Sequence, residues 1–127
     1  MTPKITKTSA VGTTQVEKTA EALFTAFVRN NTELIFQHVA EDTIFKVIGQ
    51  TAVQRKEALS HAFYTAMNLS GLIEILIQET AVYGNYVSLN GVLTHQNGRR
   101  QDFSTAMVFD GPTGTQVKEI FQRITPG

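Results

Sequence analysis

Apolar residues recur at helical spacing in the first half of the chain. Just after Thr14 they form one stripe, made of Val16, Ala20, Leu23, Phe24 and Phe27. This spacing predicts an amphipathic helix that begins at a polar cap and ends near Asn30. Thr32 can cap a second, shorter helix, and a third helix is predicted over about 53–67. Three helices therefore come before the long strands.

The second half of the chain is rich in β-branched and aromatic residues, which often alternate with polar ones. Strands are predicted over 43–48, 72–83, 87–96, 103–109 and 116–124. Asn97-Gly98 lies between two of these runs and predicts a tight hairpin with a type I′ turn, in which both residues have positive φ. Strands that are joined by such short turns pair antiparallel.

The order of these elements predicts an α+β domain. Three N-terminal helices would pack in the concave face of a strongly curved, mainly antiparallel sheet. No internal repeat or linker interrupts the pattern over 14–127, so we expect a single domain there. Residues 1–13 are polar, and we expect them to form a disordered tail.

Composition narrows the classes of function. The 127 residues are 42% hydrophobic and 17% charged, as in an ordinary globular domain, and 11 basic residues balance 11 acidic ones. Because neither sign gathers into a run, we expect no nucleic-acid partner and no membrane partner. The absence of cysteine excludes disulfides and thiolate chemistry. The first residues lack the apolar run of a signal peptide, so a cytoplasmic location is expected.

Three short segments carry a resemblance to a known superfamily. They are Ala40-Glu41-Asp42-Thr43-Ile44-Phe45, Asn97-Gly98-Arg99 and Met107-Val108-Phe109-Asp110-Gly111. With the order of elements over 14–124, they make the chain resemble the nuclear transport factor 2-like superfamily, which includes SnoaL-like polyketide cyclases, ketosteroid isomerase and limonene epoxide hydrolase. The resemblance implies a cystatin-like cone, in which a bent sheet wraps the first helix and encloses an apolar cavity.

The resemblance also allows a comparison of catalytic positions. The general base of ketosteroid isomerase corresponds to about Lys46, and the residues of its oxyanion hole correspond to about Leu23 and Thr105. The first position needs a carboxylate, and the other two need a phenol and a neutral acid. None of the three side chains in this chain supplies the required group. We therefore do not expect this chain to have the isomerase activity.

A second comparison concerns limonene epoxide hydrolase. Arg100-Gln101-Asp102 has the residue types of part of its catalytic pattern, but this segment follows the hairpin turn. The positions that correspond to the catalytic residues of that enzyme are close to Leu89 and Gly91. We treat the match as coincidence. Asp102 remains a weak candidate for acid–base catalysis, on the condition that its side chain turns into the rim of the cavity.

A ligand pocket is the main functional expectation. The resemblance places Asn90, Val92 and Thr94 inside the cone, with Asn90 as the centre of a polar patch. The expected pocket residues are Leu23, Phe24, Phe27, Phe45, Phe63, Tyr64, Asn90, Val92, Thr94, Phe103, Thr105, Met107 and Phe109. Their aromatic side chains either line a cavity for a small apolar ligand or fill that cavity themselves.

The opposite face of the same strands is predicted to be an interface. Val87, Leu89, Leu93, Ala106 and Val108 form an apolar patch that no remaining helix would cover. A patch of this kind usually marks a binding surface. The resemblance implies dimerisation through the outer face of the sheet, so we expect a two-fold homodimer.

The three histidines, His38, His61 and His95, lack the spacing of a metal site, so we expect them to be solvated and expect neither a metal nor a cofactor. Two functions stay open. The first is a small-molecule-binding protein, with cofactor-independent isomerase, cyclase or hydrolase activity as the implied chemistry. The second is a non-catalytic ligand carrier or dimerisation module whose cavity is filled by its own phenylalanines. A measurable cavity distinguishes the two functions.

Overall fold

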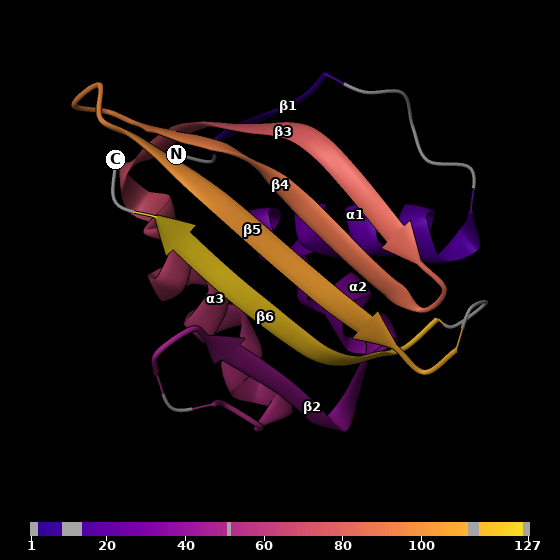
Figure 1. Ribbon diagram of the computed structural model, residues 1–127. Helices are drawn as coiled ribbons and strands as arrows, with labels where there is room; N and C mark the ends of the chain where they lie inside the picture. Colours follow the sequence, from indigo (N-terminus) through magenta and orange to yellow (C-terminus); the bar gives the residue numbers. More distant parts are fainter. Residues whose placement is uncertain (1–2, 9–13, 51, 112–114, 126–127) are drawn as a thin grey trace.

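The computed structural model describes residues 3–8, 14–50, 52–111 and 115–125. These residues form helices α1 (Gln15–Arg29), α2 (Thr32–His38) and α3 (Leu59–Met67), with 3₁₀ turns η1 (Lys56–Ala58) and η2 (Leu69–Gly71). The strands are β1 (Lys4–Lys7), β2 (Val39–Val47), β3 (Leu72–Tyr83), β4 (Tyr86–His95), β5 (Arg100–Phe109) and β6 (Val117–Thr125). Figure 1 shows the helices packed on one face of a bent sheet, which confirms the predicted α+β class.

The described strands make one six-stranded sheet in the order β1-β3-β4-β5-β6-β2. Strands β3 to β6 follow one another and pair antiparallel, because short turns connect them. The edge strands come from the first half of the chain, and they pair in parallel, β1 with β3 and β2 with β6. The sheet is therefore mainly antiparallel, as predicted, with parallel edges that the pattern did not indicate.

The β4–β5 hairpin is present at the predicted place, but its turn differs from the predicted type. Gly98 has a φ of 86°, whereas Asn97 is not among the described residues with positive φ. The Gly98 N–H donates to the His95 carbonyl at 2.9 Å, and the His95 N–H donates to the Arg99 carbonyl at 2.8 Å. This pattern is typical of a longer hairpin loop in which glycine alone takes the left-handed conformation. The type I′ prediction was wrong.

The N-terminal segment contributes an edge strand that the prediction of a disordered tail over 1–13 missed. Lys4–Lys7 pairs with β3 over Glu74–Ile77, and the Thr8 N–H adds a hydrogen bond to the Ile77 carbonyl at 3.1 Å. This segment is short and polar, so its own pattern indicates no strand. The exposed edge of β3 supplies the hydrogen bonds that hold it. The other residues of the predicted tail, 1–2 and 9–13, lie outside the described residues.

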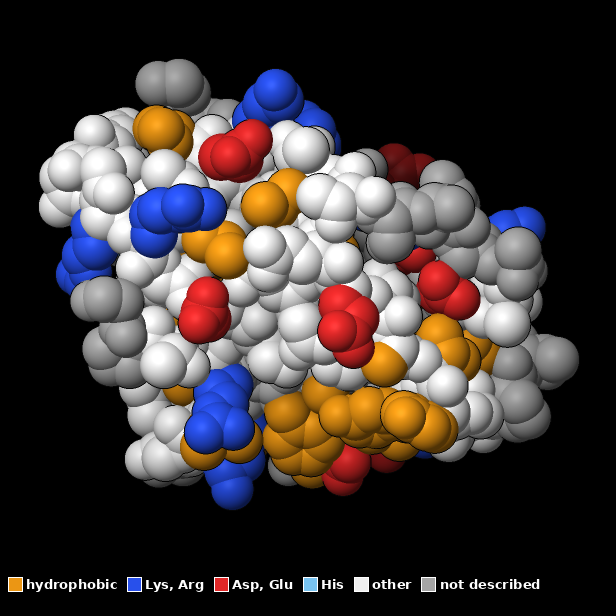
Figure 2. Space-filling model, turned by 45° about the horizontal axis from the view of Figure 1, so that its top comes forward, with side chains coloured by type: hydrophobic (Ala, Val, Ile, Leu, Met, Phe, Trp, Pro, Cys, Tyr) orange, Lys and Arg blue, Asp and Glu red, His pale blue; other side chains and the backbone are white. Residues whose placement is uncertain are grey.

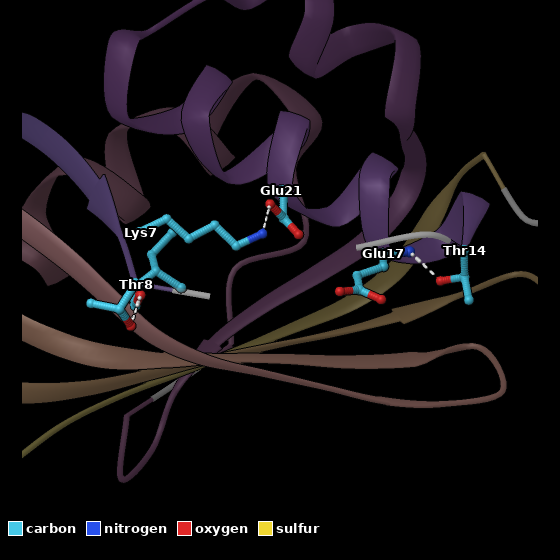
Figure 3. A network of polar contacts seen from close by, with 6 residues as sticks. Lys7, Thr8, Thr14, Glu17 and Glu21 are labelled. Carbon is cyan, nitrogen blue, oxygen red and sulfur yellow. Dashed lines mark hydrogen bonds and ion pairs between the residues drawn. The ribbon is translucent and has the colours of Figure 1, made fainter. Parts of the chain in front are cut away.

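An ion pair ties β1 to the first helix. Figure 3 shows the Lys7 side chain reaching from β1 towards Glu21 on α1, and their charged atoms lie 2.5 Å apart. In the same view the Thr14 hydroxyl accepts the Glu17 N–H at 3.1 Å, which confirms the polar cap predicted for this helix. A charged side chain that points inward from an edge strand also discourages the addition of another strand.

Three element boundaries differ from their predicted places. Asn31 rather than Thr32 caps α2, because its side chain accepts the Leu34 N–H at 3.3 Å. β2 begins at Val39, with an irregularity before Ile44. Val53 does not begin a helix but forms an isolated bridge with β2, and α3 begins at Leu59. At Val53 this bridge is a contact with a neighbouring element that outweighs the local helical pattern.

The predicted apolar stripe of α1 forms the centre of the core. Val16, Ala20, Leu23, Phe24 and Phe27 are all buried, with exposures of 0–1%. They meet the inward-facing side chains of β3 to β6 and of α3 in one continuous cluster. The helix thus lies against the sheet as its 3.6-residue pattern predicts.

Candidate functional site

The phenylalanines that were expected to line or fill the interior fill it. Phe24 stacks on Phe103 with ring centroids 5.8 Å apart, and Phe27 stacks on Phe63 at 5.0 Å. Phe63 also meets the edges of Phe24 and Phe45, at 5.7 and 6.2 Å. All five rings are at most 3% exposed. Leu23, Met107 and Phe109, at 0–1% exposure, belong to the same core.

The face assigned to β4 was wrong. Val87, Leu89 and Leu93, expected on the outside, are 0% exposed and belong to the core. Leu89 lies opposite the fully buried Thr105 of β5, so this set of alternate residues faces the helices. Asn90 and its alternating neighbours Val92 and Thr94, expected in the pocket, therefore lie on the outer face, where they are half-buried. A shift of one residue exchanges the two faces of a strand.

The predicted dimer patch does not exist as a surface. Its three β4 residues are in the core, and only Ala106 and Val108 of β5 lie on the outer face. Ala106 is only 8% exposed, because it lies between Ser88 and Phe121 on the neighbouring strands. Figure 2 shows one face of the molecule, on which hydrophobic side chains gather near the lower edge and charges of both signs are interspersed.

The acid–base candidate Asp102 is not placed at a cavity. It is exposed and lies opposite Val92 and Thr125, on the outer face of the sheet. Tyr64 on α3 is 46% exposed and, with Phe27, borders a hollow of about 660 Å³ on the other side of that helix. The condition under which Asp102 would be catalytic is therefore not met.

The positions compared with ketosteroid isomerase hold no acid. Lys46 is exposed beside Phe121, and Leu23 is fully buried among apolar side chains. The Thr105 hydroxyl donates to the Gln122 side-chain oxygen at 2.6 Å, and both residues are 0% exposed. The Gln122 side-chain nitrogen is buried and has no hydrogen-bond partner among the described residues. These two residues form a buried polar pair within the apolar core.

A hollow of about 930 Å³ lies beside the phenylalanine core. The end of β2 and its following loop, α3, the tip of the β4–β5 hairpin and the end of β6 surround it, at the side of the domain where Figure 1 shows the arrowhead of β6. Apolar side chains make up much of its lining, among them Phe45, Val47, Val53, Ala62, Ala66, Met67 and Ile124. Of the predicted pocket residues, only Phe45 lines it.

The hollow contains a histidine that the sequence interpretation took to be solvated. His95 is only 6% exposed, and its Nε2 lies 2.7 Å from the side-chain oxygen of Gln101, across the hairpin. Both residues line the hollow. With that oxygen as the acceptor, Nε2 is the donor of this hydrogen bond. His61 is exposed, as predicted, and also lines the hollow, whereas His38 is half-buried and its Nδ1 lies 2.6 Å from the Thr115 carbonyl oxygen.

The charges around the hollow are of one sign. Arg99 and Arg123 line it together with His61 and His95, and none of the described lining residues is an aspartate or a glutamate. Carboxylate acid–base chemistry therefore has no donor at this place. Within the described ranges there is also no group of three or more side chains suited to hold a metal ion. No helix in the described part of the chain has the length and apolar character needed to cross a bilayer.

Comparison with solved structures identifies the architecture. The chain superposes on a de novo designed protein with a curved β-sheet, with a TM-score of 0.71, 17% identity, and coverage of 88% of this chain and 86% of that one. It also superposes on a proposed SnoaL-like polyketide cyclase from Shewanella putrefaciens CN-32, with a TM-score of 0.70, 17% identity, and coverage of 89% and 81%. The protein has the NTF2-like fold.

A third solved structure supports the same conclusion. It is an NTF-2 like protein of unknown function from Burkholderia xenovorans LB400, with a TM-score of 0.70, 12% identity, and coverage of 89% of this chain and 84% of that one. No protein-family model matches the sequence, and no curated protein matches it. At these identities the likeness concerns the NTF2-like fold, which supports many unrelated activities, so function has to be argued from the site.

Proposed function

We propose that this NTF2-like protein binds a small, mainly apolar molecule in the hollow between α3, β2 and the β4–β5 hairpin. The observation that carries the proposal is the hollow itself, with its volume of about 930 Å³. Ligand sites in proteins occupy roughly 300 to 1,000 Å³ and are mostly apolar with a few polar groups. The volume of the hollow falls in this range and half of its lining residues are apolar, whereas the interior around Phe63 is filled with side chains.

Nine of the 18 lining residues are polar, and three of them lie together on the β4–β5 hairpin. His95 and Gln101 are joined by a hydrogen bond at the hairpin, and Arg99 lies at the turn itself. The apolar groups Phe45 and Met67 come from β2 and α3. A molecule with a compact apolar body would bury that body against these groups. Each Å² of apolar surface removed from water contributes about 25 cal/mol to the binding free energy.

A thermal-shift screen against steroids, terpenoids and aromatic polyketides tests the proposal. A compound present at 100 times its Kd stabilises the folded state by about 2.7 kcal/mol. Ala66→Phe places a ring in the hollow from α3, so we expect this variant to lose the stabilisation. Ala22→Phe is the matched control, because Ala22 is exposed on α1 and does not line this hollow.

Two results would contradict ligand binding at this place. The first is a screen in which no compound raises the melting temperature of the unmodified protein. The second is a compound that stabilises the Ala66→Phe variant as much as it stabilises the unmodified protein and the Ala22→Phe control. In the second case the compound binds elsewhere on the molecule.

Acid–base catalysis is a second candidate function, and one observation favours it. His95 is the buried titratable side chain of the hollow, and Gln101 holds its ring by a hydrogen bond of 2.7 Å. An imidazole that is oriented in this way can accept or donate a proton beside a bound molecule. The reaction would be one without a metal or cofactor, such as an isomerisation, a cyclisation or a hydrolysis.

Turnover of a bound compound tests this second candidate. If a ligand from the screen is converted, His95→Gln should lower kcat by a factor of about 10² to 10⁴, the usual contribution of a general acid or base. The Kd of the ligand should change little, because glutamine keeps the polar character of the position. An unchanged kcat would exclude His95 as the proton-transfer group, and absence of turnover for every bound compound would leave the protein a carrier.

Homodimerisation and a cytoplasmic location stay predictions. Three residues of the predicted dimer patch, Val87, Leu89 and Leu93, lie in the core. A dimer would therefore have to use other residues of the outer face, such as Val108 and Phe121. Light scattering at micromolar concentration measures the mass directly, and a mass of one chain would refute the dimer.

A further inference from the structure

We infer that the molecule bound in the hollow carries a carboxylate, which Arg99 binds at the hairpin end while the apolar body lies towards α3. This inference rests on the proposed function, because it names the class of ligand for the same hollow. It is carried by the distribution of charge around the hollow, which is independent of the hollow's size. The proposed function alone requires only an apolar ligand.

The first argument is the sign of the charges. Arg99 and Arg123 line the hollow with His61 and His95, and no described lining residue is acidic. The ion pairs of the described residues use Lys7, Lys56 and Lys118, so neither arginine is neutralised by a described carboxylate. A permanent positive charge at the mouth of an apolar hollow raises the local concentration of anions.

The second argument is the position of Arg99. Its N–H donates to the Asn97 side-chain oxygen at 2.9 Å, and its carbonyl accepts the His95 N–H at 2.8 Å. The backbone from which the guanidinium extends is therefore held at the tip of the hairpin. A guanidinium presents paired N–H donors that match the two oxygens of a carboxylate.

The third argument is that the lining combines polar and apolar groups. His95 and Arg99 belong to the β4–β5 hairpin, whereas α3 contributes the apolar Ala62 and Met67 together with the polar Thr65. A ligand that matches this lining is amphipathic, with the acidic group at the arginine end. A phosphate or a sulfate without an apolar body would leave the α3 side empty.

A matched pair of probes tests the inference. The acid 2-naphthoate and its neutral amide, 2-naphthamide, have nearly the same shape and differ in charge. We expect isothermal titration at low salt to give a Kd at least ten times lower for 2-naphthoate. Raising the salt concentration from 50 to 500 mM should reduce this preference, because exposed charges are screened.

Variants of neighbouring arginines locate the effect. Arg99→Gln should reduce the preference for 2-naphthoate at least fivefold and leave the Kd of 2-naphthamide unchanged, and the Arg99→Gln/Arg123→Gln variant should abolish it. Arg100→Gln is the control, because this substitution removes the same charge from the next residue in the chain. Arg100 does not line the hollow. All of these residues are exposed, so the variants should remain folded.

Three results would overturn the inference, and each is distinguishable from failure of the proposed function. Equal Kd values for the two probes would refute the carboxylate while leaving apolar binding intact. Equal losses in the Arg99→Gln and Arg100→Gln variants would mean that net charge, rather than this site, attracts the acid. Absence of 2-naphthoate binding at millimolar concentration refutes the inference, even if neutral compounds in the thermal screen bind.

Discussion

The ammonium of Lys7 lies 2.5 Å from a carboxylate oxygen of Glu21, and each side chain is only 17% exposed. The second carboxylate oxygen of Glu21 is buried and has no partner among the described residues. This pair joins the first strand to the first helix across 14 positions of sequence. It holds the N-terminal strand by a side-chain contact, in addition to the backbone pairing with β3.

Removal of one partner should therefore cost stability. We expect Lys7→Met to lower the free energy of unfolding by about 1 to 3 kcal/mol, because it leaves a poorly hydrated carboxylate unpaired. Lys7→Met/Glu21→Leu should recover at least half of that loss. Urea denaturation measures both changes. The control is Lys118→Met, whose ion pair with Asp42 spans 3.8 Å at exposed side chains and should matter by less than about 0.5 kcal/mol. Equal losses in Lys7→Met and the control would contradict the prediction.

Gly91 should not tolerate a side chain. A Cβ at this position would lie 1.7 Å from the Leu76 carbonyl oxygen and 3.0 Å from the Phe103 ring. Gly91→Ala therefore has to displace the backbone of β3, and we expect a loss of at least about 3 kcal/mol in the free energy of unfolding. Gly111→Ala serves as the control, because a Cβ there meets nothing within 4 Å. A stable Gly91→Ala variant with native circular dichroism would show that β3 and β4 are not packed in this register.

The buried pair of Thr105 and Gln122 should behave as one unit. Thr105→Val removes the hydroxyl that donates at 2.6 Å and leaves the whole Gln122 amide unpaired in the core, at a cost of about 1 to 3 kcal/mol. Thr105→Val/Gln122→Met replaces both polar groups with apolar ones and should be more stable than the single variant. Chemical denaturation of the double-mutant cycle measures the coupling. Additive losses would mean that the two side chains act independently.

Among the aromatic residues of the core, Phe63 should lower the stability most when it is replaced by alanine. Its ring is 0% exposed and meets the rings of Phe24, Phe27 and Phe45. Phe63→Ala should lower the free energy of unfolding by about 3 to 5 kcal/mol and leave an apolar cavity able to bind benzene. Phe36→Ala, at a residue that is 40% exposed, is the control and should cost far less. If benzene stabilises the unmodified protein as much as the Phe63→Ala variant, then the core already contains a cavity.

Much of the fold follows from local patterns in the sequence. The stripe of α1, the Thr14 cap and the hairpin at Asn97-Gly98 each depend on residues close together in the chain. The order of helices and strands then leaves few arrangements besides an α+β domain. Strand β1 was missed because Lys4–Lys7 has no strong strand pattern, and its strand conformation depends on the edge of β3.

The site depended on contacts that no local pattern shows. Phe45, Ala62, His95 and Ile124 line one hollow, although they come from four separate elements. The contact of His95 with its hydrogen-bond partner Gln101 could have been predicted only if the hairpin register had been known.

The sequence by itself determined most of the segments that become helices and strands, β1 excepted, because capping, turn chemistry and apolar spacing act over a few residues. Tertiary structure decided which face of β4 is buried, since alternation defines two faces without stating which one meets the helices. The apolar set Val87, Leu89 and Leu93 was a usable signal for the inner face, and packing against α1 is the reason that it lies there. Only the assembled sheet brings Arg99 and α3 to the same hollow, because that proximity depends on strand pairing over long distances in the chain.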